Sequence, residues 1–185
     1  AGGSARGVWR VPEISGTKIA RRQMYIIRQW ATRHARSLEV FYQLTARLFH
    51  ACDAIWVGIG IARLERPFAV VESWTKGVLF DCRMCGRCHL SVTGMTCVMN
   101  CPKAIRNGPC GGVRANGHCE VKPAMPCVWV EAWKGAQSMR LGNAIRVPLA
   151  PRDHAIEGTS AWLRLSAENI DRQRTAKRRA DEVLS

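Results

Sequence analysis

The chain has 185 residues, of which 9 are cysteine, and its 28 Lys and Arg outnumber its 14 Asp and Glu to give a formal net charge of +14. The longest apolar run, residues 54–62, is far shorter than the roughly 20 residues that cross a bilayer, which argues against a membrane span. Residues 1–7 lack the apolar stretch of a secretory signal, which argues against a secreted disulfide scaffold and predicts a cytoplasmic protein.

The first half of the chain is predicted to be helical. Residues 1–16 are polar and rich in Gly, and we expect an irregular, basic N-terminal segment there. A basic helix without Gly or Pro is predicted over residues 17–34, and Ser37 has the character of an N-cap for the next helix. Apolar residues then recur at spacings of three and four, as on an amphipathic helix: Leu38, Phe41, Leu44, Leu48, Cys52 and Ile55. Gly58 and Gly60 interrupt this pattern.

Pro67 is expected to begin a further helix, which should end near Gly77. With it, residues 17–80 form a predicted helical arm. Cys52 lies alone on the apolar stripe of this arm, so we interpret it as a small buried hydrophobic residue and not as a ligand.

The second half of the chain differs in composition. In residues 81–134, Gly and Pro are frequent and no long periodic segment is present, so bound metal is the most economical way to organise a cysteine-rich domain there. Within it, residues 128–133 fit either a short strand or the start of a helix. Residues 135–185 are predicted to form a covering segment and then a basic helix over 161–182. The predicted fold class is mostly α, with a loop-rich, cysteine-rich metal-cluster core and little regular β.

The most specific motif is the run Cys82-x2-Cys85-x2-Cys88. A triplet with this spacing is typical of three ligands of a [4Fe–4S] cube, whereas zinc sites usually take separated pairs. Two cubane clusters need eight thiolates, and the segment supplies eight predicted metal ligands: Cys82, Cys85, Cys88, Cys97, Cys101, Cys110, Cys119 and Cys127.

The spacing predicts which ligands belong together only in part. The triplet should share one cluster, and we assign Cys97, Cys101 and Cys110 mainly to the other. Cys119 and Cys127 complete the two sets in an order that the spacing leaves open. A ferredoxin-like exchange, in which Cys101 crosses to the first cluster, is an open alternative.

Three glycines surround one of these cysteines in the run Gly108-Pro109-Cys110-Gly111-Gly112. Because glycine has no side chain, its backbone can approach inorganic sulfur closely. We therefore predict that Gly108, Gly111 and Gly112 are cofactor-binding residues. Zinc is the alternative metal, since thiolate-only sites also suit zinc.

The motifs follow one another as Asp81-Cys82-Arg-Met-Cys85-Gly86-Arg-Cys88, Thr93-Gly94-Met95-Thr-Cys97-Val-Met99-Asn-Cys101-Pro102-Lys103, Arg106-Asn107-Gly108-Pro109-Cys110-Gly111-Gly112, Gly117-His-Cys119-Glu120-Val121 and Cys127-Val-Trp129. In this order they closely resemble the methylenetetrahydrofolate reductase C-terminal family over about residues 66–134. That family includes the small cysteine-rich subunit that accompanies the flavin-containing reductase barrel in acetogenic bacteria. Its members commonly have Cys-Pro-Met where this chain has Cys97-Val98-Met99, a change that removes no ligand.

The resemblance implies an iron–sulfur subunit of one-carbon metabolism that exchanges electrons with the flavin of a partner reductase. The sequence contains no Gly-rich phosphate loop, no nucleophile–base arrangement and no paired carboxylates. We therefore expect a non-catalytic electron-transfer subunit that relays single electrons through two [4Fe–4S] clusters, with the flavin in the partner only.

The apolar stripe of the arm is more hydrophobic surface than a small metal core covers, which predicts a hetero-oligomer in which the arm packs on the reductase subunit or on a second copy. The basic N-terminal segment is expected to lie along an acidic groove. Helices that simply cover the cluster domain are the alternative. The rival function is a structural zinc module that supports a partner enzyme. A nucleic-acid-binding zinc protein is less favoured, because the aromatic residues do not interleave with the basic run.

Overall fold

The computed structural model describes residues 18–108 and 110–184, and 62% of the chain is helical. The α-helices of the described residues are α1 (Lys18–Arg33), α2 (Ala35–Ala51), α3 (Asp53–Ile59), α4 (Ile61–Phe80), α5 (Val128–Ser138) and α6 (Ala161–Leu184), and the short 3-10 helices are η1 (Val98–Asn100), η2 (Gly142–Arg146) and η3 (His154–Ile156). Within this part of the chain, extended pairing is confined to isolated bridges. The mostly helical class with little regular β is confirmed, and the prediction for residues 1–16 lies outside the described residues.

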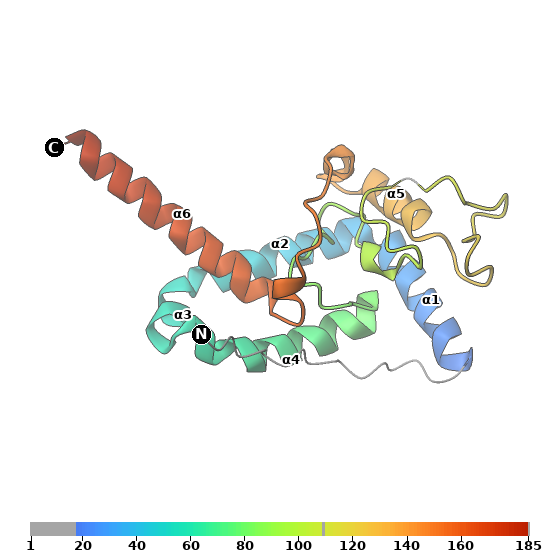
Figure 1. The fold of residues 1–185 in the computed structure, drawn as a ribbon, viewed down its shortest axis with the longest axis horizontal. Coiled ribbons are helices and arrows are strands. Elements are labelled where there is room, and N and C mark those ends of the chain that lie inside the picture. The colour runs from blue at the N-terminus through green and yellow to red at the C-terminus, as the bar shows by residue number, and fades with distance from the viewer. Residues whose placement is uncertain (1–17, 109, 185) are drawn as a thin grey trace, which may run out of the picture.

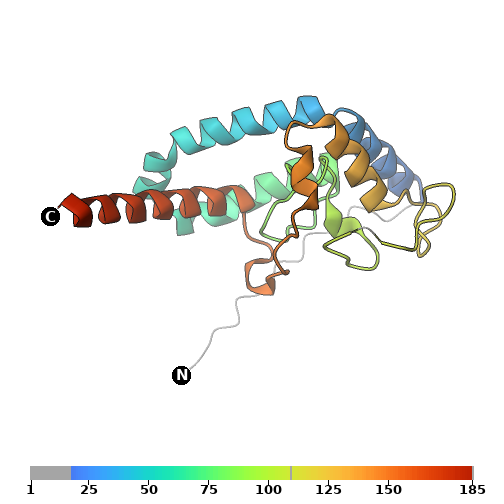
Figure 2. The same ribbon diagram turned by 90° about the horizontal axis from the view of Figure 1, so that it is seen from above.

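The helices form a long arm at one end of the molecule and surround the cysteine-rich loops at the other (Figure 1). α2 leads away from these loops, α3 makes the turn, and α4 returns to them. α6 packs against α4 and α2, and its second half extends beyond α3 as an isolated rod (Figure 1, Figure 2). α1 packs against both α4 and α5 beside the loops. The end of α4 therefore leads the chain directly into the first cysteines.

Two helices begin earlier than the sequence predicts. α2 begins at Ala35 and not after Ser37, because Ala35 is fully buried in the main core and packing there extends the helix. α4 begins at Ile61, directly after Gly60, whose φ of +95° changes the chain direction. Pro67 therefore lies inside α4 and does not begin it. Pro67 is exposed, so the carbonyl that loses its helical donor is accessible to solvent.

α4 also continues beyond Gly77, where the sequence predicts its end. The reason is Phe80, which packs in the main core with Leu90 and Met95 and so favours one more turn. Asp81 follows with a left-handed φ of 50°, and its N–H donates to the carbonyl of Gly77 at 3.0 Å. A left-handed residue at this point ends the helix and turns the chain into the cysteine-rich loop.

The segment that fits either strand or helix is helical, because it begins α5. Trp129, Ala132 and Ala136 of α5 are buried at spacings of three and four, the pattern of a helix with one packed face. The predicted C-terminal helix is confirmed as α6. None of the described helices combines the length and the apolar character needed to cross a membrane.

A contact between two glycines fixes the cysteine-rich loop on α5. Gly94 has a left-handed φ of +61° and lies against Gly135 with no side chain between the two backbones. A Cβ on Gly94 would collide with the carbonyl oxygen of Ala132 and lie 2.6 Å from the amide nitrogen of Ala136. Only glycine allows this approach without displacing α5.

Candidate metal centre

Four of the predicted ligands line one cavity at the end of α4. Cys82, Cys85 and Cys88 lie on the loop that leaves α4, and Cys97 lies just before η1. Apolar side chains form much of the remaining wall: Phe80, Met84, Leu90, Val98 and Met99. We call Cys82, Cys85, Cys88 and Cys97 the first cysteine set.

The loop that carries the triplet turns tightly and is held from outside. Asp81, Met84 and Gly86 have left-handed φ values of 50°, 44° and 74°. Such values are uncommon for residues other than glycine and require support from the surroundings. The N–H of Gly158 donates to the carbonyl of Met84 at 2.8 Å, and a Cβ on Gly86 would lie 2.9 Å from the carbonyl carbon of Ile156. The covering segment therefore fixes the triplet loop.

Backbone amides are directed at three of the cysteine sulfurs. Each of the three accepts the N–H two residues further on: Met84 to Cys82 and Gly112 to Cys110, both at 3.4 Å, and Met99 to Cys97. Cys97 also accepts the backbone N–H of Arg83. An N–H donor favours the anionic thiolate over the neutral thiol. The loops are thus arranged for negative sulfur, which is the form that binds metal.

The thiols of the first cysteine set influence one another. Burial raises the pKa of the Cys82 thiol well above its ordinary value, and nearby Cys97 and Cys88 add to the effect. The pKa of Cys97 is raised to about 11, chiefly by burial and also by Cys85 and Cys88, although the backbone N–H groups of Met99 and Arg83 act to lower it. Cys82 and Cys97 therefore resist ionisation unless positive charge lies beside them. A bound metal or metal cluster supplies that charge.

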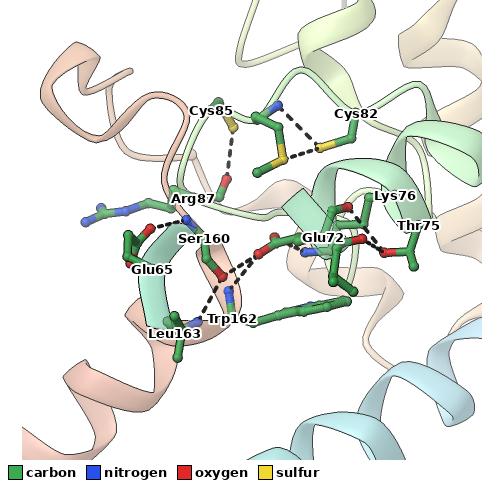
Figure 3. A network of polar contacts seen from close by, with 12 residues as sticks. Glu65, Glu72, Thr75, Lys76, Cys82, Cys85, Arg87, Ser160, Trp162 and Leu163 are labelled. Atoms are coloured by element: carbon green, nitrogen blue, oxygen red, sulfur yellow. Dashed lines mark hydrogen bonds and ion pairs between the residues drawn. The ribbon is translucent and has the colours of Figure 1, made fainter. Parts of the chain in front are cut away.

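A buried ion pair forms the α4 side of the same cavity (Figure 3). The Nζ of Lys76 lies 2.6 Å from the Oε1 of Glu72, and the two side chains are 3% and 2% exposed. Burial acts to lower the pKa of Lys76, but Cys88, Tyr42 and Glu72 together raise it above its ordinary value. Sequence reasoning missed this pair, because a Glu–Lys pair at i,i+4 ordinarily lies on a solvated helix face.

His89 also lines the cavity, next to Cys88. Its Nε2 lies 2.6 Å from the Nη2 of Arg106, which donates to it. The pKa of His89 is lowered to about 4, chiefly by burial and also by the nearby charges of Arg106 and Arg87. The ring is therefore neutral at pH 7, and the nitrogen that faces Arg106 is already engaged.

Three further cysteines gather around the start of α5. Cys101, which follows η1, packs in two neighbouring apolar clusters, one with Cys127 and one with Cys119. Backbone hydrogen bonds join the segment that carries Cys119 to the segment that carries Cys127. The N–H of Cys119 donates to the carbonyl of Met125 at 2.9 Å, and the N–H of Cys127 donates to that of Gly117 at 3.0 Å.

Backbone pairing brings the segment that follows Cys110 next to the segment that carries Cys119. The N–H of Glu120 donates to the carbonyl of Gly112 at 3.2 Å, and Val113 forms a bridge with Cys119. The segment after Cys110 thus runs beside the segment that carries Cys119. We call Cys101, Cys110, Cys119 and Cys127 the second cysteine set.

The structure places two individual cysteines differently from expectation. Cys97 lines the cavity of the triplet, and η1 lies between it and Cys101, so its predicted grouping with Cys101 and Cys110 is not the arrangement seen here. Which cysteines share a cluster stays a prediction. Cys52 is half-buried and not buried, because it lies at the exposed corner between α2 and α3. It lines an apolar groove together with Phe49 and is not among the residues of the triplet cavity.

The predicted cofactor-binding glycines have different surroundings. A Cβ on Gly108 would lie 2.7 Å from the ring carbon Cε3 of Trp129, so Gly108 makes room for that ring. A Cβ on Gly112 would collide with the carboxylate of Glu120, and its N–H is the donor to a cysteine sulfur described above. Gly111 has open space on its Cβ side. Their role as cofactor-binding residues stays a prediction.

Within residues 18–108 and 110–184, no three His, Cys, Asp or Glu side chains converge closely enough to hold a single metal ion. Zinc draws its sulfurs to about 2.3 Å from one point. A cubane has iron at four corners, so its cysteine sulfurs surround a volume and do not meet at one point. The first cysteine set supplies four thiols around one cavity and N–H donors to sulfur, which is the donor set that such a cluster takes.

The fold and the site define a mostly helical protein with two sets of four cysteines. A protein-family model described as methylene-tetrahydrofolate reductase C terminal matches residues 61–155, which is half of the chain. The chain belongs to this family, as the resemblance of its motifs predicts. The comparison with curated proteins gave no match, and neither did the comparison with solved structures.

Proposed function

We propose that the chain is the iron–sulfur electron-transfer subunit of a methylenetetrahydrofolate reductase-type complex. The first cysteine set holds one [4Fe–4S] cluster in this proposal, and the second cysteine set holds another. The observation that carries it is the convergence of Cys82, Cys85, Cys88 and Cys97 on one cavity, with backbone N–H groups directed at two of their sulfurs. The family of the chain supplies the link to the reductase.

The residues around the first cysteine set suit this role. When bound, a [4Fe–4S] cluster supplies one-electron chemistry. Phe80, Leu90 and Val98 form an apolar wall beside the half-buried sulfurs. Backbone N–H donors stabilise thiolate, and Lys76 adds a positive charge beside Cys88. The chain itself thus provides ligands, an apolar wall and charge.

The proposed partner is a flavoprotein that docks on the arm. Large apolar side chains are exposed along α2–α4: Phe41, Leu44, Leu48, Val70 and Trp74. Leu48 is 67% exposed and Trp74 is 69% exposed, so these positions do not pack over the cysteine-rich loops. Apolar surface gathered on one part of a protein is typical of a binding site for another protein.

Metal analysis tests the cluster assignment. The chain, co-expressed with its reductase and purified without oxygen, should contain about eight irons and eight sulfides and absorb broadly near 400 nm. Colourless protein with stoichiometric zinc would refute the electron-transfer role and leave a structural zinc module that supports the reductase.

Single substitutions test the two cysteine sets separately. Cys97→Ser should remove about half of the iron by removing the cluster of the first set, and Cys101→Ser should remove the other half. Cys52→Ser is the matched control and should leave the iron content unchanged. An unchanged iron content in Cys97→Ser would refute the grouping of Cys97 with the triplet.

Docking is tested by changing the exposed apolar side chains. The double variant Leu48→Ser, Trp74→Ser should reduce co-purification with the reductase at least tenfold while keeping its iron. Val147→Ser is a matched control, because Val147 is 64% exposed but lies outside the arm. Undiminished co-purification of the double variant would contradict docking through the arm.

A further inference from the structure

Figure 3 shows Lys76 and Glu72 of α4 near Cys82 and Cys85, and Lys76 lines both the cavity of the first cysteine set and the apolar groove of the arm. Both residues lie on α4, and both line the cavity that holds Cys82, Cys85, Cys88 and Cys97. Among the described residues, neither Lys76 nor Glu72 donates a hydrogen bond to a cysteine, so the pair does not hold the cysteine side chains in position. The pair therefore calls for another explanation.

The position of the ammonium is fixed by several contacts. The Nζ of Lys76 lies 2.6 Å from the Oε1 of Glu72, 4.7 Å from the ring centre of Trp162 and 5.8 Å from that of Tyr42. Aromatic faces stabilise a cation that has lost its water. These partners come from α2, α4 and α6, so the charge cannot move toward solvent without disturbing three helices.

The carboxylate of Glu72 is fixed in turn by the start of α6. Its Oε2 accepts the hydroxyl of Ser160 at 2.7 Å and the N–H of Trp162 at 3.3 Å, while its Oε1 faces Lys76. The hydroxyl of Ser160 also accepts the N–H of Leu163 at 3.3 Å. The start of α6 thus holds the carboxylate in place, while Lys76 lies close enough to Cys88 for the two charges to act on each other.

A buried ion pair is a costly way to fill a protein interior. Replacing such a pair by apolar residues of similar volume is often neutral or stabilising, because both charges lose their water. Packing alone therefore does not explain why Glu72 and Lys76 of α4 are buried beside the first cysteine set. A requirement for a positive charge at that cavity does explain the pair.

We propose that Lys76 sets the reduction potential of the cluster held by the first cysteine set, and that Glu72 moderates its effect. This inference rests on the proposed function. Reduction adds one electron, and hence one unit of negative charge, to the cluster and its four thiolates. A positive charge nearby stabilises the reduced form, and the effect is strong where water is excluded. Arg87, which is exposed, acts through solvent and salt and so contributes less.

Two substitutions should shift the potential in opposite directions. Lys76→Met removes the positive charge and keeps an unbranched chain, and Glu72→Gln removes the opposing negative charge and keeps an acceptor for Ser160. We expect Lys76→Met to lower the ratio of reduced to oxidised first cluster at least tenfold at a fixed potential, which for one electron corresponds to about 59 mV. We expect Glu72→Gln to raise the same ratio.

The measurement is a redox titration of the anaerobic complex with dithionite, followed by the electron paramagnetic resonance signal of each reduced cluster. The cluster of the second cysteine set serves as internal reference and should keep its midpoint. Lys177→Met is the matched control, since Lys177 lies on the exposed second half of α6. Lys76→Arg keeps the charge and should stay within about threefold of the unaltered protein, a shift well inside the tenfold effect of losing the charge.

The outcomes separate this inference from the proposed function. An unaltered chain without iron refutes the proposed function. Full iron content with unchanged midpoints in Lys76→Met and Glu72→Gln, or shifts of both in the same direction, overturns the role of Lys76. If Lys76→Met loses its iron, the other two variants decide. An unchanged midpoint in Glu72→Gln then overturns the role of Lys76 in setting the potential. A raised midpoint in Glu72→Gln, together with an unaltered midpoint in Lys76→Arg, supports that role.

Discussion

The contact between the cysteine-rich loop and α5 is tested by adding one methyl group to Gly94. Gly94→Ala places a Cβ against the carbonyl oxygen of Ala132 and 2.6 Å from the amide nitrogen of Ala136. Both neighbours belong to the backbone of α5 and cannot rotate away. The residue must also keep its left-handed φ of +61°, which alanine disfavours.

The expected loss of stability is the sum of these two effects. The left-handed backbone costs about 1–2 kcal/mol for a residue with a Cβ. Forcing a methyl group into a closely packed contact costs about 1–3 kcal/mol. Together they destabilise the protein by about 2–5 kcal/mol, which for a chain of this length lowers the melting temperature by about 4–20 °C.

Gly77→Ala is the matched control, because it adds the same methyl group to a glycine of α4 that has no neighbour within 4 Å of a Cβ. There alanine should stabilise the helix by about 0.5–1 kcal/mol and raise the melting temperature by about 1–4 °C. The assay is thermal unfolding of the anaerobically purified protein, followed by circular dichroism at one heating rate. Equal melting temperatures of Gly94→Ala and the unaltered chain would show that the loop does not rest on α5 in this way.

Two further contacts give predictions of the same kind. Glu39 is buried on α2 and accepts the N–H groups of Arg140 and Leu141 at 2.8 and 3.1 Å. Glu39→Ala leaves both N–H groups without this acceptor and should lower the free energy of unfolding, measured in urea, by about 3 kcal/mol. A loss below about 0.5 kcal/mol would contradict the contact. Asp53 of α3 accepts the side-chain amide of Asn169 on α6 at 3.0 Å and the hydroxyl of Ser166. Asp53→Ala should loosen α6 around Asn169 and speed trypsin cleavage there several-fold, whereas an unchanged cleavage pattern would show that other contacts hold this part of α6.

The sequence predicted the helices whose signals are local. α1 and α6 contain no Pro or Gly, and the structure gives them nearly the expected bounds. The errors concern residues whose place depends on contacts far along the chain. The sequence predicts that Pro67 begins a helix, but α4 begins earlier, directly after Gly60. At its other end, α4 continues to Phe80, because the ring of Phe80 packs in the main core. Helix starts and ends of this kind depend on packing more than on propensity.

The cysteine motif indicates eight candidate ligands, but its spacing does not show which of them lie together in the fold. Spacing alone placed Cys97 with Cys101, since only three residues lie between them. The structure separates them because those three residues form η1. The pair of Glu72 and Lys76 was missed for a related reason, because no local pattern distinguishes a buried i,i+4 pair from an exposed one.

The turn η1 also determines how the two cysteine sets are related in space. It connects Cys97 of the first set to Cys101 of the second, so any change in its conformation moves one set relative to the other. Asn100 fixes it, because its side-chain amide donates to the carbonyl of Phe80 at 3.0 Å and its Oδ1 accepts the Nε of Arg83 at 3.0 Å. Both partners flank the start of the triplet loop. The same buried amide thus holds the end of α4, the first set and the start of the second set in one arrangement.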